Sequence, residues 1–132
     1  MAYELSNEER RKRKAAEKIK YQGFLENEEN AQIRIGQFGG NWQSLPVGEF
    51  AKGLGLKINF AGFWEVSDSG KKVEGVHSSG YKFIMDSTRV YYRVQNAAGQ
   101  YVDAQGRTIG DPAYNGDQDS FNEASHFMNK SS

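Results

Sequence analysis

Three groups of polar side chains could carry out chemistry in this chain, and the first lies around a histidine. His77 follows Glu74 in a stretch between two expected strands, where catalytic groups are often found. Arg89, Tyr91 and Arg93 recur at every second residue, so a strand would place them on one face. A histidine that moves protons near neutral pH, with arginines that stabilise developing negative charge, is sufficient for metal-independent cleavage of RNA. A ribonuclease-type toxin is therefore one interpretation, and a surface histidine beside an Arg-Tyr-Arg row packed by cation–π contacts is the interpretation we favour.

The second group is acidic and lies near the carboxyl end. Asn115, Asp117 and Asp119 place oxygen ligands at the spacing that opens a calcium loop. The pattern then fails, because Ser120 stands where the sharp turn needs glycine and His126 stands where a bidentate acid is needed. We expect a solvated acidic loop with no metal and no cofactor, and we keep an irregular calcium site as the alternative. The chain has no cysteine, which excludes thiolate catalysis and cysteine–zinc sites.

The third group is a basic run near the amino terminus. Residues 1–22 carry seven basic and four acidic side chains, a net charge of +3, whereas residues 100–132 carry two basic and five acidic ones, a net charge of −3. Local charge of this kind steers association even though the whole chain is neutral. We expect this basic head to dock on a protein partner or a larger assembly, such as that of a virus or mobile element. The candidate contacts are Arg10, Arg11, Lys12, Arg13, Lys14 and Lys18.

The charge pattern of the head also bears on three other partners: nucleic acid, a second copy of the chain and a membrane. A lysine- and arginine-rich helix can neutralise phosphates, so nucleic acid is an alternative partner. The opposite charges of head and tail also allow weak self-association through exposed ion pairs. Membrane binding would need an apolar helix face, and residues 7–14 have none. The chain has no apolar run of about 18 residues and no secretory pattern, so we expect a cytoplasmic protein.

The length of 132 residues suits one domain. We divide the chain into a basic helical head (1–22), an α+β body (23–110) and an acidic tail (111–132) with a helix as one interpretation. Ser6 and Glu9 form the pattern of a capping box, which predicts a helix over 7–21. Short helices are expected over 45–53 and 120–128. Alternating apolar residues predict strands over 32–38, 56–66, 71–76, 80–85, 89–94 and 100–103.

These elements predict an α+β fold. An amino-terminal helix would accompany a five- to six-stranded, mainly antiparallel meander sheet or partly rolled barrel, followed by a short carboxyl-terminal helix. Trp42, Phe63 and Tyr114 are expected on the surface as apolar anchors for a partner. The predicted core is Ile33, Ile35, Phe50, Leu54, Ile58, Phe60, Trp64, Phe83, Val90, Tyr92, Val94 and Val102. The function that we favour is a small non-catalytic interaction module or assembly subunit.

Overall fold

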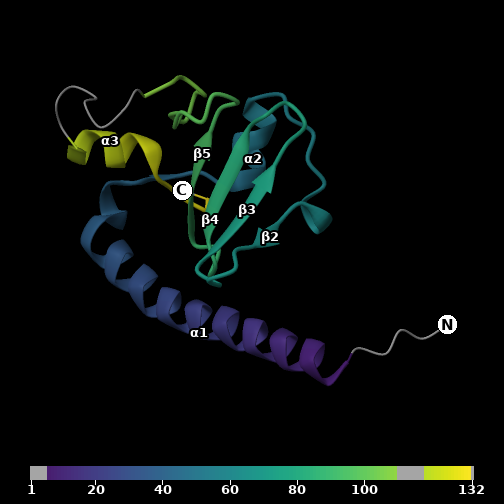
Figure 1. The fold of residues 1–132 in the computed structure, drawn as a ribbon. Coiled ribbons are helices and arrows are strands. Elements are labelled where there is room, and N and C mark those ends of the chain that lie inside the picture. Colours follow the sequence, from purple (N-terminus) through teal and green to yellow (C-terminus); the bar gives the residue numbers. More distant parts are fainter. Residues whose placement is uncertain (1–5, 110–117, 132) are drawn as a thin grey trace.

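The structure, a computed structural model, describes residues 6–109 and 118–131. A long helix α1 (Asn7–Phe38) leads into a 3₁₀ turn (Gly39–Asn41), strand β1 (Gln43–Ser44) and helix α2 (Val47–Gly53). A second 3₁₀ turn (Phe60–Gly62) precedes strands β2 (Glu65–Val66), β3 (Lys72–Val76), β4 (Lys82–Asp86) and β5 (Tyr91–Gln95). Helix α3 (Gln118–Ser125) and strand β6 (Phe127–Met128) complete the described elements (Figure 1).

The fold is α+β, with one open six-stranded sheet in the order β1-β6-β5-β4-β3-β2. Strands β2 to β5 form the predicted antiparallel meander, and β6 also pairs antiparallel with β5. Strand β1 pairs with β6 in parallel, so the sheet is mixed and does not close into a barrel. Among the described residues, no helix has the length and apolar character needed to cross a bilayer.

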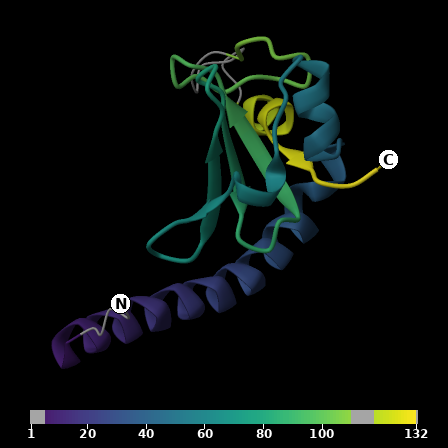
Figure 2. The same ribbon diagram turned by 90° about the vertical axis from the view of Figure 1, so that its right-hand side faces the viewer.

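The main core lies between α2 and one face of the sheet (Figure 2). The register aligns Val73, Met85, Tyr92 and Phe127 on that face, with Phe83 and Val94 beside them, and all six are buried. Phe50 of α2 meets Phe83, Tyr92 and Phe127 at ring-centroid distances of 6.1, 6.0 and 5.2 Å. Such aromatic contacts add specific geometry to the burial of apolar area.

Most of the predicted core is confirmed. Phe50, Phe83, Tyr92, Val94 and Val102 are buried, and Leu54, Ile58, Phe60 and Trp64 are half-buried against them. Ile35 and Val90 pack against a second small cluster, formed by Ala31, Trp42, Tyr91 and Met128. The prediction was wrong for Ile33, which is 51% exposed, and for Trp42, which is buried in this cluster. Phe63, also expected on the surface, is half-buried against the main core, and Tyr114 lies outside the described residues.

The strand predicted over 32–38 is wrong, because these residues continue α1. The capping box is confirmed at the start of the helix: the Glu9 amide donates to Ser6 Oγ (3.1 Å) and the Ser6 amide donates to Glu9 Oε2 (3.2 Å). Beyond residue 21, contacts with the sheet extend the helix, since Gly23, Asn27 and Ala31 recur every fourth residue and are all buried. The alternating isoleucines that suggested a strand therefore lie on different sides of a helix.

The strand predicted over 56–66 is also wrong except at Glu65–Val66. Leu56, Ile58 and Phe60 do face the core while the residues between them are exposed. The alternation therefore comes from an extended segment with one buried side, which pairs with no strand among the described residues. Gly75 explains part of this path, because a side chain there would overlap the ring of Phe63. The strand predicted over 100–103 is likewise replaced by isolated bridges, Gln95 with Tyr101 and Val102 with Thr108.

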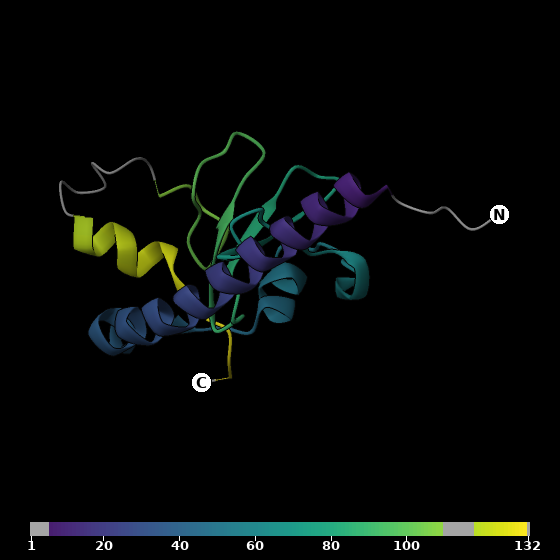
Figure 3. The same cartoon turned by 60° about the horizontal axis from the view of Figure 1, so that its bottom comes forward.

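Helix α1 crosses the end of the sheet, where it contacts the turn between β2 and β3 and the turn between β4 and β5 (Figure 3). At the first, Gly23 lies so close to the turn before β3 that an added methyl group would overlap the carbonyl oxygen of Ser69. Gly70 fits as tightly against the carbonyl of Lys20, and its φ of 76° also favours glycine. At the second, Asn27 Nδ2 donates to Ser87 Oγ (3.0 Å) and to Asp86 Oδ2 (3.2 Å).

We predict that Gly23→Ala destabilises the protein although alanine is the better helix former. The added methyl group would force α1 away from the turn, and overpacking of this kind costs about 1–3 kcal/mol. Gly36→Ala is the matched control, because the space around Gly36 in the same helix is open. It should stabilise by up to ~1 kcal/mol. Urea denaturation of both variants measures the difference, and equal stability would show that α1 does not rest on this turn.

Candidate functional site

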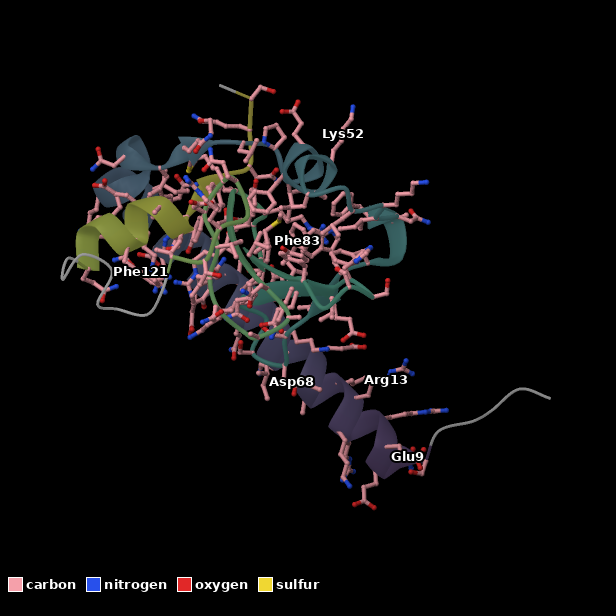
Figure 4. All side chains as sticks on the ribbon, turned by 90° about the horizontal axis from the view of Figure 1, so that it is seen from above. Glu9, Arg13, Lys52, Asp68, Phe83 and Phe121 are labelled. Carbon is pink, nitrogen blue, oxygen red and sulfur yellow. The ribbon has the colours of Figure 1, made fainter. Side chains whose placement is uncertain are left out.

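The basic head is exposed along the first half of α1. Every residue from 6 to 19 is exposed, and the helix extends past the sheet, with Glu9 and Arg13 near its outer end (Figure 4). Lys12 Nζ lies 3.6 Å from Glu8, an exposed pair one helical turn apart that contributes little to stability. Helix α1 continues without a break past residue 22, so the head and the body share one helix. The candidate partner-binding side chains are therefore presented on a regular helix.

His77, the catalytic histidine of the alternative ribonuclease interpretation, lies in the loop after β3. The Ser79 amide donates to His77 Nδ1 (3.0 Å), so the ring proton belongs on Nε2, which lies 3.2 Å from the carbonyl oxygen of Lys57. Both ring nitrogens therefore have protein partners. Glu74, in strand β3, has its carboxylate paired with Lys82 Nζ at 3.2 Å.

The predicted row of Arg89, Tyr91 and Arg93 is divided between a turn and a strand. Arg89 lies in the turn before β5 with a φ of 63°, and its guanidinium lies 5.8 Å from the centre of the Trp64 ring. Val76 pairs with Lys82 at one end of the β3–β4 ladder, and Lys72 pairs with Asp86 at the other. His77 and Arg89 are therefore at opposite ends of the sheet. The five residues proposed for RNA cleavage do not meet in one site.

Arg93 instead lines a pocket that the sequence analysis missed, and Tyr91 packs against Trp42 of its wall. It occupies ≈ 470 Å³ between the last turns of α1, strand β5 and the junction of α3 with β6. We call it the arginine pocket and define it by the residues that line it: Arg34, Phe38, Asn41, Trp42, Arg93, Asn122, Glu123 and His126. These residues come from distant parts of the sequence, so no local spacing indicates them.

Aromatic packing builds the inner wall of the arginine pocket. The rings of Trp42 and His126 are stacked with centroids 4.8 Å apart. The ring of Tyr91 lies 5.1 Å from that of Trp42. Arg34 Nη1 donates to the Tyr91 hydroxyl at 3.3 Å. Arg93 donates to the Tyr101 hydroxyl and lies 3.9 Å from the centre of that ring, a cation–π contact.

The electrostatics of the pocket keep His126 neutral. Burial is the main cause that lowers the pKa of His126 to about 4, and the nearby guanidinium groups of Arg93 and Arg34 lower it further against the hydrogen bond to Asn122. His126 Nδ1 donates to the Asn122 carbonyl oxygen at 2.7 Å, which leaves Nε2 as the unprotonated nitrogen. Burial also lowers the pKa of Arg93, while Tyr101 opposes that shift. The pocket therefore holds arginine cations beside a histidine that carries no charge at pH 7.

The alternative calcium site falls largely beyond the described part of the chain. Asn115 and Asp117 lie outside the described residues, and Asp119 belongs to α3, whose start is described without that side chain. Within residues 6–109 and 118–131, no three histidine or acidic side chains gather in a way that could hold a metal ion. The acidic group therefore stays a sequence-based prediction.

Comparison with models of known families, with curated proteins and with solved structures finds no match for this chain. The geometry of the head and of the pocket is therefore the basis for its proposed function.

We predict that His126 makes stability fall as the pH is lowered from 7 toward 4. The unfolded chain binds a proton on this residue near pH 6.5 and the folded chain only near pH 4, so the folded state loses stability over that window. The shift corresponds to ~3 kcal/mol at most. Urea unfolding at pH 7 and pH 4 should show a smaller loss for His126→Gln than for the natural chain. An equal loss in both would contradict the buried, neutral histidine.

Proposed function

We propose that this chain is a non-catalytic interaction module that docks through the basic head of α1 onto an acidic surface of a protein partner. The observation that carries the proposal is the complete exposure of residues 6–19, a helical segment with a strong excess of basic side chains. A helix that were only structural would bury a stripe of its surface against its own domain. This half of α1 has no such stripe.

The outer side of α1 supplies an apolar surface next to the charges. Tyr21 and Leu25 flank Gly23 by two residues on either side, so at 100° per residue they point away from the sheet. They are 64% and 45% exposed, and Leu25 and Ile33 line a shallow hollow on the helix surface. Exposed tyrosine and leucine at helical spacing are typical anchors of a helix that lies in a partner's groove.

The distribution of charge favours a protein over a membrane or a nucleic acid. Glu28 and Glu29 line the same hollow as Leu25, so an anionic membrane surface would meet repulsion next to the apolar contacts. Glu8, Glu9 and Glu17 lie among the basic residues of the head and reduce its attraction for a continuous row of phosphates. A protein surface can match such a mixed pattern, because its own charges are also mixed.

The pKa of the pocket histidine favours binding over catalysis. A general acid or base works best with a pKa near the working pH, whereas that of His126 is lowered to about 4. His77, the other histidine, has its ring nitrogens engaged by Ser79 and by the carbonyl oxygen of Lys57. Of the two, only His126 lines the pocket with Arg34 and Arg93, and its lowered pKa leaves it a poor acid at pH 7.

We predict that removing residues 1–18 leaves the body folded and abolishes docking. The exposed half of α1 makes no packing contact that the body needs, so the free energy of unfolding should change by no more than ~0.5 kcal/mol. Thermal and urea unfolding monitor the body. A loss of several kcal/mol would show that the head packs on its own sheet.

Docking itself is tested with immobilised poly-L-glutamate as an acidic polypeptide probe. The triple variant Arg10→Gln, Arg11→Gln, Lys14→Gln should lose retention at ~50 mM salt, and the natural chain should be released at ~500 mM, where charges are strongly screened. The matched control is Lys52→Gln, Lys57→Gln, Lys130→Gln, which removes three exposed charges outside the head. Equal loss in both triples would refute a role of the head.

We also predict that the purified protein leaves RNA intact in the presence of a metal chelator. The proposed alternative, ribonuclease-type cleavage by His77 with Arg89 and Arg93, requires these groups to act on one phosphodiester. His77 and Arg89 are at opposite ends of the sheet, and Arg93 pairs with Ile84 between them. Electrophoresis of a labelled RNA after incubation measures cleavage. Cleavage that disappears in His77→Ala would contradict the non-catalytic proposal.

A further inference from the structure

We propose that the arginine pocket is a binding site for a phosphate group, as carried by a small phosphomonoester. The site is separate from the basic head and its function does not depend on docking. It brings together two guanidinium groups, Arg34 from α1 and Arg93 from β5, at one cavity of ≈ 470 Å³. Burial is the main cause that lowers the pKa of Arg93, and the nearby charge of Arg34 lowers it further.

The guanidinium groups of Arg34 and Arg93 have more N–H donors than the described residues offer as acceptors. Each arginine has five N–H donors, and among the described residues Arg34 and Arg93 each donate to one tyrosine hydroxyl. Within the same set of residues, neither forms an ion pair. Arg93 is half-buried and Arg34 is exposed. A guanidinium that is partly out of water without a counter-charge is costly, so the free donors of Arg93, with those of Arg34 beside it, favour an oxyanion ligand.

The charge around the cavity also favours an anion. Its lining holds two arginines against the single carboxylate of Glu123, and His126 is neutral at pH 7. A neighbouring hollow of ≈ 260 Å³ shares both arginines and adds Lys72. The carboxylate of Asp86 in that hollow is already occupied, because it accepts hydrogen bonds from the amides of Val90 (2.8 Å) and Tyr91 (3.0 Å).

The remaining groups suit the rest of a phosphomonoester. The Tyr91 hydroxyl accepts from Arg34 and lines the neighbouring hollow that shares both arginines, where its own hydrogen can be donated to a phosphate oxygen. Phe38 lines the cavity and is 51% exposed, which offers an apolar surface for an organic group. Planar guanidinium forks match the oxygens of phosphate in pairs, and a dianionic phosphate matches two arginines in charge.

Calorimetry on the full chain tests the site with phenyl phosphate and inorganic phosphate as probes, at constant ionic strength. Phenyl phosphate should bind more tightly than inorganic phosphate, because its ring can contact Phe38, and acetate should bind more weakly than either. Arg34→Gln removes one fork and should weaken binding of both phosphates by roughly tenfold or more. Arg107→Gln, an exposed arginine outside the pocket, is the matched control and should leave binding unchanged.

Nuclear magnetic resonance of the natural chain gives a readout that needs no variant. The chain has two histidines, of which His126 lines the pocket and His77 does not. Addition of phenyl phosphate should shift the ring resonances of His126 and leave those of His77 in place. The proposal is overturned if His126 does not respond, if acetate binds as well as phosphate, or if Arg107→Gln weakens binding as much as Arg34→Gln.

Discussion

A buried carboxylate must be surrounded by hydrogen-bond donors, and the fold of this chain depends on how that requirement is met at Asp86. This residue is 5% exposed. One oxygen accepts from the amides of Val90 and Tyr91, and the other accepts from Thr88 and from the side chain of Asn27. Without these donors the charge would cost several kcal/mol. The carboxylate thus joins the turn, the start of β5 and helix α1.

The same carboxylate determines where the candidate sites lie. By fixing the turn before Tyr91, it sets which side of β5 faces α2 and which faces the arginine pocket, because a shift of one residue would exchange the two faces. By holding Asn27, it places the following two turns of α1, and with them Arg34, beside Tyr91. The basic head then extends past the other side of the crossing at Gly23.

Sequence patterns were informative where local physics decides the structure. The capping box at Ser6, the meander of strands and the helix after Pro46 depend on neighbouring residues, and the structure confirms them. The length of α1 and the path of residues 56–64 depend on contacts with the sheet, such as that of Phe63 over Gly75. Apolar residues that recur every second or fourth position do not carry this information. The arginine pocket was missed for the same reason, since Arg34, Arg93 and His126 meet only after folding.

The continuity of α1 has a consequence for the cooperativity of helix formation. A polar helix of about fourteen residues is marginal in water when isolated, because nucleation of the first turn is unfavourable. Here the half that contacts the sheet, from Gly23 to Ala31, serves as the nucleus, and the residues before it join by propagation alone. The head is therefore ordered before any partner arrives. An association that begins from an ordered helix loses less conformational entropy than one that must fold a free segment.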